Sequence, residues 1–286
     1  MTDTDQKFGF TEQDLRDLPT VYRDDLFASK TALVTGAGSG LGKAIAALFA
    51  RLGANLVVAG RDAAKIEAAA VFFGSLGSGT ILSQSTNIRD PEQVSALIDQ
   101  TWDAFGGLDT LVNNGGGQFP QAAIDFSVKG WNAVIDTNLN GTWHMMQAAA
   151  RRWRDADRPG AIVNIVADVW RGMPGIAHTA AARGGVIYLS KSVAVEWAPL
   201  NIRVNCIAPG CCETEGFGVY PPEGVETYTQ ANPMRRTGDA QDIAEACVYL
   251  AAPSGKFITG EVVTVDGGQQ LWGDPWPTGR PDNFKL

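Results

Sequence analysis

The sequence predicts an α/β fold in which helices cover both faces of one doubly wound, seven-stranded parallel sheet. Short runs of β-branched and apolar residues recur along the chain, and alanine-rich segments with helical periodicity lie between them. A glycine-rich loop follows the first of these runs. Strands that are separated by helices pair in parallel, because a right-handed crossover returns the chain to the same end of the sheet.

Seven segments are predicted to be strands, in chain order 31–35, 55–59, 80–84, 110–113, 161–166, 203–207 and 262–265. The segments 42–52, 91–105, 176–199 and 240–252 are predicted to be helices. Asp90-Pro91-Glu92 and Asp239 mark two helix starts, since acidic residues and proline are favoured before or within a first turn. We expect one domain over residues 30–268, after an N-terminal arm of residues 1–29 and before a C-terminal tail of residues 269–286.

The composition is that of an ordinary globular enzyme, with 45% hydrophobic and 19% charged residues. The net charge of −8 argues against nucleic acid as a partner, because binding a phosphate backbone needs a dense basic face. No run reaches the roughly 18 apolar residues of a membrane helix, and residues 1–25 lack the apolar stretch of a signal peptide. The four cysteines lack metal-site spacing. We therefore expect a cytoplasmic protein without a metal site.

The first predicted strand leads into Thr35-Gly36-Ala37-Gly38-Ser39-Gly40-Leu41-Gly42, and a predicted helix follows. Such a unit brings backbone N–H groups and a helix N-terminus against a pyrophosphate, and side chains at the glycines would block that approach. The glycine spacing differs from the commoner G-x-G-x-x-G pattern. The loop still predicts a Rossmann-type dinucleotide-binding domain.

The end of the second predicted strand indicates which dinucleotide is bound. Enzymes that use NAD place an acidic residue there to bind the ribose 2′-hydroxyl. This chain has Gly60-Arg61 instead, which leaves space and offers a guanidinium to a 2′-phosphate. We therefore predict NADP(H), although Asp62 follows directly and Arg61 could equally be a solvated residue that begins the next helix.

Four ordered motifs over roughly residues 29–268 resemble the short-chain dehydrogenase/reductase family: the glycine-rich loop, Asn113-Asn114-Gly115-Gly116, Asn138 in a helix, and Pro209-Gly210. The resemblance implies roles for residues around the whole cofactor. Pyrophosphate candidates are Gly36, Ser39, Leu41 and Gly42; adenine candidates are Asn87 and Ile88; adenosine-ribose candidates are Asn114 and Gly115; nicotinamide candidates are Pro209, Gly210, Cys212 and Thr214; Gly40 and Gly116 are further cofactor-binding candidates.

The catalytic segment departs from the pattern of that family. Most members carry Y-x-x-x-K after the fifth strand, where this chain reads His178-Thr179-Ala180-Ala181-Ala182-Arg183. Thr179 thus replaces the tyrosine and Arg183 the lysine, and the upstream serine position falls on Val166 or Ala167. The resemblance makes Asn138, Thr179 and Arg183 the candidate catalytic residues.

These substitutions change the possible chemistry. A threonine hydroxyl does not ionise near neutral pH but donates a hydrogen bond, and arginine stays protonated while its fork can hold ribose hydroxyls. Alcohol oxidation, which must remove a hydroxyl proton, loses its usual general base. Reduction of a C=C bond conjugated to a carbonyl does not need that base, because hydride goes to the β-carbon and fixed hydrogen-bond donors stabilise the enolate oxygen.

A closer resemblance favours that second reaction. Three segments resemble peroxisomal trans-2-enoyl-CoA reductases, and more distantly 2,4-dienoyl-CoA reductases, both of which act on acyl-CoA with NADPH. They are residues 113–119, 178–183 and 191–198. Bacterial proteins of citronellol and acyclic-terpene breakdown are also similar, including Ala167-Asp168-x-Trp170. An alcohol or aldehyde oxidoreductase of terpenoid breakdown and a non-catalytic NADP(H)-binding protein therefore stay open as alternatives.

Two further residues and the assembly complete the expectations. Asp168 follows the fifth predicted strand, at the edge where doubly wound folds bind ligands, so it is a substrate-pocket candidate or an exposed loop carboxylate. Tyr188 lies about 180° around the helix from Thr179 and should face away from the nicotinamide. The family resemblance implies a homo-oligomer, a tetramer or dimer, that pairs the helices at 130–153 and 176–199.

Overall fold

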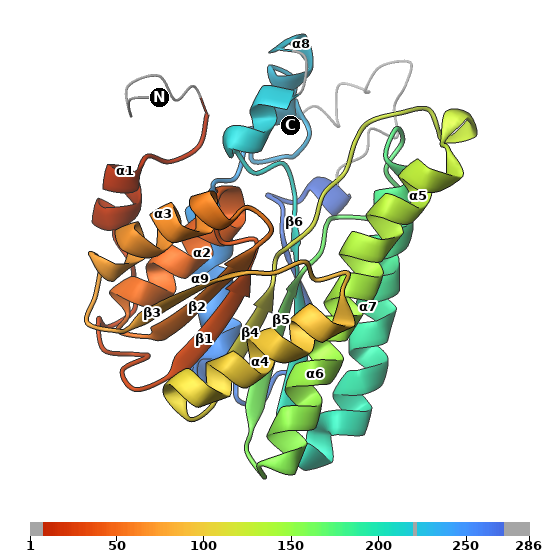
Figure 1. Cartoon of the computed structure of the whole chain (residues 1–286). Coiled ribbons are helices and arrows are strands. Elements are labelled where there is room, and N and C mark those ends of the chain that lie inside the picture. The colour runs from red at the N-terminus through yellow and green to blue at the C-terminus, as the bar shows by residue number, and fades with distance from the viewer. Residues whose placement is uncertain (1–7, 220–221, 272–286) are drawn as a thin grey trace.

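The computed structural model describes residues 8–219 and 222–271, and in that part of the chain seven parallel strands form one sheet (Figure 1). The spatial order is β3-β2-β1-β4-β5-β6-β7. The strands are β1 (Thr31–Thr35), β2 (Asn55–Gly60), β3 (Ile81–Ser85), β4 (Thr110–Asn113), β5 (Gly160–Ile165), β6 (Ile202–Pro209) and β7 (Val262–Val265). The predicted doubly wound α/β fold is confirmed, and each strand lies within a few residues of its predicted position.

The strand order reverses between β1 and β4. The chain runs outward from β1 to β2 and β3, and then returns to place β4 on the other side of β1. The loops after these two strands therefore separate at their carboxyl ends, which opens a crevice there. Because β1 ends at Thr35 and β4 at Asn113, the glycine-rich loop and the 114–117 loop border that crevice.

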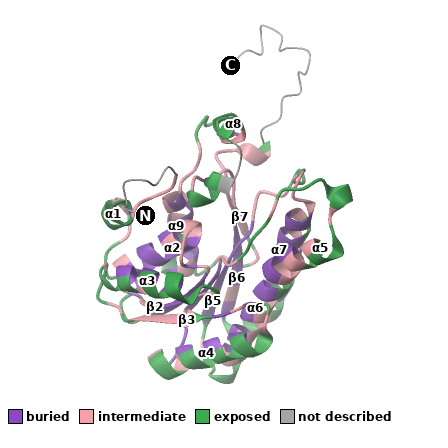
Figure 2. Cartoon of the chain, turned by 45° about the horizontal axis from the view of Figure 1, so that its top comes forward, coloured by how far each residue is buried: buried purple, intermediate pink, exposed green. Residues whose placement is uncertain are grey.

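Helices cover both faces of the sheet, and each face has its own apolar core (Figure 2). One face packs against α2 (Gly40–Arg51), α3 (Ala63–Gly74) and α9 (Ala240–Ala251). The other packs against α4 (Pro91–Phe105), α6 (Gly141–Asp155) and α7 (Ala177–Trp197). The sheet is thus buried between two helical layers, and only its ends are accessible to ligands. No helix among residues 8–219 and 222–271 has the length and apolar character needed to cross a bilayer.

Local signals position several helix ends. Asp90 accepts hydrogen bonds from the backbone N–H groups of Glu92 and Gln93, and Asp239 forms a capping box with Asp242. Both predicted helix starts are therefore confirmed. Gly106 ends α4 with a φ of 68°, a conformation in which glycine is favoured.

The predicted helix 130–153 is interrupted. It consists of α5 (Val128–Ile135), a π-helical turn η3 (Asp136–Asn140) and α6. Asn138 lies in the π-helical turn, a distortion that is frequent at functional sites. The predicted helix 176–199 ends its α-helical part at Trp197 and continues as the short 3₁₀ turn η4 (Ala198–Leu200), because Pro199 has no N–H to donate.

Short elements lie outside this framework. Before β1, α1 (Glu12–Asp17) packs on the outside of α2, and after β6 the chain forms η5 (Glu215–Val219), α8 (Pro222–Val225) and η6 (Tyr228–Gln230). The remaining 3₁₀ turns are η2 (Ala123–Asp125), η7 (Pro253–Gly255) and η8 (Gln269–Leu271). Residues 1–7 of the predicted arm and 272–286 of the predicted tail lie outside the described residues.

Candidate active site

The glycine-rich loop is closed tightly against the loop after β4. A Cβ on Gly42 would overlap the Gly36 carbonyl oxygen and the Asn114 amide nitrogen, and Gly36 itself has a φ of +67°. Ser39, the residue that precedes α2, makes no side-chain cap hydrogen bond. The first turn of α2 therefore offers backbone N–H groups to an anion, as a pyrophosphate site requires.

Asn114 fixes this loop. Its side-chain amide donates to the carbonyl oxygens of Thr35 (3.1 Å) and Gly36 (3.2 Å). The Thr35 hydroxyl in turn accepts from the N–H groups of Asn114 (3.1 Å) and Gly115 (2.9 Å). The Asn114 amide is thus used to join the ends of β1 and β4, while its predicted contact with the adenosine ribose stays a prediction.

A cavity of about 230 Å³ opens at the carboxyl ends of β1, β2 and β4. It brings together the following predicted cofactor residues: Gly36, Ser39, Arg61, Asn87, Ile88, Gly115 and Gly116. Lys65 also lines it, and the sequence analysis missed that residue. The available signal was its place in the first turn of α3, because helical side chains point back toward the N-terminus.

Two cations face this cavity without counterions. Within the described residues neither Arg61 nor Lys65 forms an ion pair. The nearby carboxylate of Asp62 is used to cap α3, where it accepts the backbone N–H of Lys65 at 3.1 Å. The cavity therefore combines a glycine loop and two unpaired cations, which fits a nucleotide that carries phosphates.

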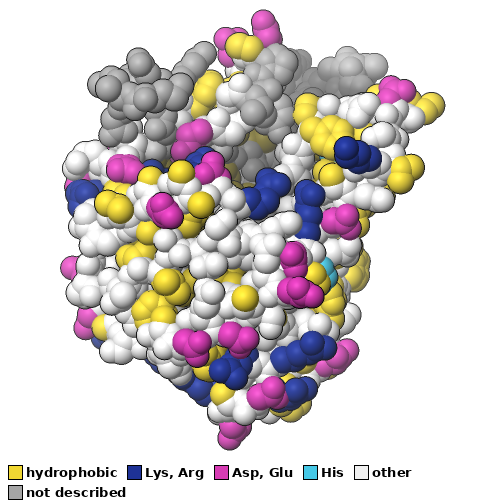
Figure 3. Space-filling model, in the orientation of Figure 1, with side chains coloured by type: hydrophobic (Ala, Val, Ile, Leu, Met, Phe, Trp, Pro, Cys, Tyr) yellow, Lys and Arg dark blue, Asp and Glu magenta, His cyan; other side chains and the backbone are white. Residues whose placement is uncertain are grey.

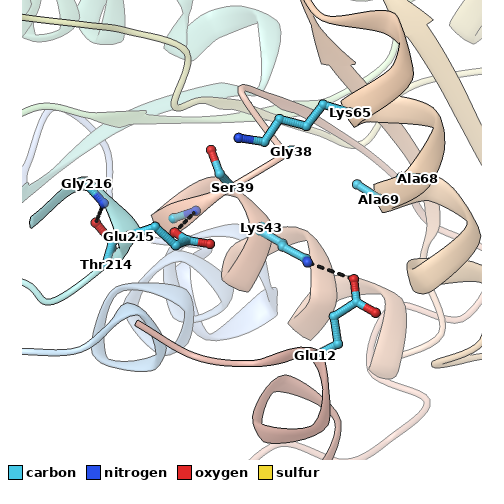
Figure 4. Close-up of a pocket in the computed structure, with 11 residues that line it drawn as sticks. Glu12, Gly38, Ser39, Lys43, Lys65, Ala68, Ala69, Thr214, Glu215 and Gly216 are labelled. Atoms are coloured by element: carbon cyan, nitrogen blue, oxygen red, sulfur yellow. Dashed lines mark hydrogen bonds and ion pairs between the residues drawn. The ribbon is translucent and has the colours of Figure 1, made fainter. Parts of the chain in front are cut away.

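A second cavity of about 580 Å³ shares Gly38, Ser39 and Lys65 with the first (Figure 4). Figure 4 shows the Lys65 side chain extending across Gly38 toward Ser39. Thr214, a predicted nicotinamide residue, lies on the opposite wall with Glu215. The Glu215 carboxylate accepts the Gly40 N–H at 2.9 Å, so a pyrophosphate that binds this N–H would displace the Glu215 side chain.

The other predicted nicotinamide residues lie toward β7. Gly210 and Cys212 line a third cavity of about 260 Å³ together with Asp266, and the Pro209 carbonyl accepts the Asp168 N–H at 3.1 Å. Gly210 lies so close to Asp266 that a Cβ there would be 2.8 Å from the Asp266 Cα. The side chain of the predicted pyrophosphate residue Leu41 packs against the core.

Arg183 is a buried cation at the centre of the catalytic segment. Its Nη1 donates to the Ile165 carbonyl at 2.9 Å, and no carboxylate of the described residues forms an ion pair with it. Burial lowers the pKa of Arg183 to about 10, so the side chain stays charged at neutral pH. Its Nη2 lies directly against Gly116, where a Cβ would also be 2.8 Å from the Asn138 Oδ1. Arg183, Gly116 and Asn138 therefore meet.

Asn138 uses both ends of its amide to hold the loop after β4. Its Oδ1 accepts the Gly117 N–H and its Nδ2 donates to the Gly117 carbonyl, both at 2.9 Å. Asn138 lies in the π-helical turn between α5 and α6, and its side chain points from there toward this loop. Asn138 therefore orders the loop that also borders the cofactor crevice.

Thr179 is buried next to a histidine whose importance the sequence analysis missed. The His178 Nδ1 accepts the Thr179 backbone N–H at 2.7 Å and lies 3.3 Å from the Thr179 hydroxyl oxygen. The imidazole stacks on Phe126 with a centroid distance of 4.4 Å and meets Phe119 edge-on at 4.6 Å. Burial lowers the pKa of His178, which favours the neutral ring at neutral pH. Its place beside Thr179 was the available signal.

Asp168 lies half-buried at the carboxyl ends of β5 and β6. Burial, and then the charge of Asp266, raises the pKa of its carboxyl group. Burial and the Asp168 charge likewise raise the pKa of the Cys211 thiol. Tyr188 is 70% exposed, so it is not part of the core.

Comparison with known proteins places these features in a family. The family model described as "Enoyl-(Acyl carrier protein) reductase" matches residues 36–270. A probable 2,4-dienoyl-CoA reductase of Bacillus subtilis (strain 168) is 36% identical over 87% of this chain and 98% of its own length. The 3-oxoacyl-(acyl-carrier-protein) reductase FabG of Chlamydia muridarum is 35% identical over 86% of this chain and 99% of its own length.

A solved structure agrees with these relatives. The citronellol catabolism dehydrogenase AtuB of Pseudomonas aeruginosa PAO1 superposes with a TM-score of 0.78 at 34% identity, covering 88% of this chain and 99% of that one. The match to the family model covers the glycine-rich loop from Gly36 onward, strands β2 to β7 and the catalytic segment. The chain therefore belongs to the short-chain dehydrogenase/reductase family of oxidoreductases, which use a nicotinamide cofactor.

Proposed function

We propose that this protein reduces the conjugated C=C bond of a trans-2-enoyl-CoA-like thioester with NADPH. The observation that carries the proposal is the catalytic segment, which holds a buried, unpaired Arg183 and a buried Thr179 where the family has an ionisable lysine and tyrosine. Hydride addition to an activated C=C bond requires stabilisation of an enolate oxygen, and it does not require a side chain that removes a hydroxyl proton.

The choice of NADPH rests on Arg61 and Lys65. Both cations line the cavity beside the glycine-rich loop, and neither forms an ion pair within the described residues. An NAD-specific site would instead present a free carboxylate to the ribose 2′-hydroxyl. Here the Asp62 carboxylate caps α3, so it is engaged with the protein. A 2′-phosphate is the group that best matches two free cations at this position.

The bound cofactor supplies the hydride, and the residues of the chain supply orientation and charge. Arg183 stays protonated and holds ribose hydroxyls, because its remaining N–H groups form no ion pair with a carboxylate of residues 8–219 and 222–271. Thr179 donates its hydroxyl to the enolate oxygen; its contact with His178 Nδ1 is 3.3 Å, long enough for the hydroxyl to turn toward the substrate. The α-carbon of the enolate also takes up a proton, and Asp168, whose raised pKa favours the protonated form, is our candidate to deliver it through water from its place after β5.

The relatives support an acyl thioester as substrate. The names of two of them refer to a dienoyl-CoA and to a 3-oxoacyl group on a carrier protein, and the family model refers to an enoyl group on a carrier protein. These names describe those proteins. For this chain we propose acyl-CoA as the small-molecule partner.

Alcohol or aldehyde oxidoreduction in terpenoid breakdown is the second candidate function. Its support is the likeness to the citronellol catabolism dehydrogenase, together with the neutral His178 beside the Thr179 hydroxyl. A neutral imidazole is an acceptor toward which a threonine hydroxyl can orient its proton. A non-catalytic NADP(H)-binding protein is the third candidate.

A turnover panel separates the three candidates. Trans-2-enoyl-CoA, 2,4-dienoyl-CoA and 3-oxoacyl-CoA esters are tested with NADPH, and citronellol with NADP+. Enoyl-CoA turnover supports the proposal, whereas citronellol oxidation without enoyl-CoA reduction replaces it with the second candidate. Cofactor binding without turnover on any of these substrates supports the third.

We also propose that the chain assembles as a homodimer or homotetramer through α5 and α7. Four large apolar side chains are exposed on these helices, Val128 (77%), Trp131 (38%), Tyr188 (70%) and Val195 (77%). Exposed apolar groups on adjoining helices are typical of subunit interfaces. Light scattering measures the assembly, and a monomer would contradict the proposal. A cytoplasmic location stays a prediction.

A further inference from the structure

The N-terminal arm contacts the loop that follows β6, although about 200 residues separate them in the sequence. The Gly9 N–H donates to the Glu213 carboxylate at 3.3 Å. Phe8 meets the Phe217 ring edge-on at a centroid distance of 6.0 Å, and Phe217 in turn meets Tyr228 at 5.0 Å. The arm therefore contacts the loop at two points, on either side of Thr214.

Thr214 is enclosed between two glycines from different parts of the chain. A Cβ on Gly9 would lie 3.2 Å from the Thr214 Cα and 3.0 Å from the Glu215 nitrogen. On the other side, a Cβ on Gly40 would lie 3.6 Å from the Thr214 Cβ. Gly9 also has a φ of +80°, a conformation that side chains with a Cβ rarely adopt. Only glycine at position 9 allows the arm to approach the loop this closely.

The other end of the arm is fixed to the body of the domain. Glu12 pairs with Lys43 of α2 at 2.8 Å, and Leu15 is buried in the core. Arg16 donates to the Ser75 carbonyl at 3.1 Å and to its hydroxyl at 3.0 Å, at the end of α3. Figure 1 shows α1 beside these helices, with the preceding residues running toward the carboxyl edge of the sheet. The arm thus contacts both α2, the helix that follows the glycine-rich loop, and the loop that contains Thr214.

We propose that residues 8–12 position Thr214 against the glycine-rich loop, so that cofactor affinity depends on the arm. The arm precedes the range that the family model matches, residues 36–270. Both Thr214 and Glu215 line the cavity beside Ser39, and Glu12 of the arm lines it as well. A loop that is already held in place loses less conformational entropy when a ligand binds. Gly9 and Phe8 are positioning residues, since they act through the loop.

The test measures cofactor binding without any substrate, so it is independent of the reaction proposed above. Three changes are made in the full chain: deletion of residues 2–9, Gly9→Ala and Phe8→Ala. Val21→Ala is the matched control, because Val21 lies in the same arm and is 89% exposed. Calorimetry gives the Kd for NADPH and for NADH, hydrogen exchange follows residues 211–219, and thermal melting reports folding.

We expect the deletion and Gly9→Ala to weaken both cofactors by about tenfold, as expected when one or two ordered side chains are released. The NADPH to NADH ratio and the melting temperature stay as in the control, and exchange in residues 211–219 becomes faster. Phe8→Ala gives a smaller effect in the same direction. Unchanged affinity in the deletion variant would overturn the proposal. A fall in affinity that merely follows a lower melting temperature would overturn it too.

Discussion

Two halves of the domain differ in how their sites are built. One half lies around β1 and β4, and the other lies around β5 to β7. Around β1 and β4, close backbone approach fixes the site: Gly42 has no room for a Cβ, and Asn114 joins two loops through three hydrogen bonds. Around β5 to β7, Thr179 and Arg183 differ from the family pattern, and we propose that these individual side chains set the chemistry. A fold can therefore keep its cofactor site while its reaction changes.

The largest expected effect tests the chemistry of the second half. Thr179→Val keeps the shape of the side chain and removes its hydroxyl. If Thr179 donates to the enolate oxygen, enoyl-CoA reduction should slow by roughly 10²- to 10³-fold, the effect of losing one oxyanion donor. Steady-state kinetics measure the rate of enoyl-CoA reduction, and NADPH titration measures the cofactor affinity. The Kd for NADPH should stay within about twofold, and full activity would mean that another group holds the oxygen.

The second largest effect is expected at the cofactor site in the half of the domain around β1 and β4. Arg61→Ala and Lys65→Met each remove one of the two unpaired cations beside the glycine-rich loop. A hydrogen bond to a charged group contributes about 1.5–3 kcal/mol, so either change should weaken NADPH by about tenfold to hundredfold. Binding of NADH should change little, because it lacks the 2′-phosphate. Lys30→Met is the matched control, since Lys30 is a surface cation that pairs with Asp109 at the start of β1, at the other end of the strand from the glycine-rich loop. Equal losses for NADPH and NADH would remove the argument for a 2′-phosphate site.

A smaller effect is expected where the two halves meet. Arg183→Lys restores the residue type of the family but loses the planar fork that donates to the Ile165 carbonyl. Losing one net hydrogen bond corresponds to about 0.5–1.5 kcal/mol, or roughly twofold to tenfold in NADPH affinity. The pH profile of turnover should keep its shape, because Arg183 with a pKa of about 10 does not titrate near neutrality. A shifted pH optimum with unchanged affinity would instead assign proton transfer to this position.

The smallest effect concerns Asp168. The pKa of Asp168 is raised in the folded protein, so ionisation of its carboxyl group destabilises the fold. The stability is present in full below the unfolded pKa and is lost as pH rises through the folded pKa. Asp168→Asn should therefore raise the melting temperature at pH 7 by about 1–2 °C and change it little at acidic pH below the unfolded pKa. Calorimetric melts at both pH values measure this. A lower melting temperature at pH 7 would show that the charge is compensated, and a loss of turnover in the same variant would identify Asp168 as a proton donor.

Local patterns in the sequence were sufficient for the framework. The helix α4 begins and ends where predicted, at Pro91 and Phe105, because Asp90 caps its start and Gly106 adopts the left-handed conformation at its end. Strand β4 agrees with its prediction residue by residue. The interruption of the helix at Asn138 was not predictable in this way, since the π-helical turn depends on packing against the 114–117 loop and α7.

The sequence by itself determined the order of strands and helices, the glycine-rich loop and the departures at Thr179 and Arg183. Each of these depends on residues that are neighbours along the chain, where periodicity, capping and turn preferences act. Only the tertiary structure decided which distant groups meet: Glu215 at the Gly40 N–H, Lys65 over Gly38, and Gly9 against Thr214. The physical reason is that such contacts depend on strand order and on loops closed across long stretches of chain, which no local pattern specifies.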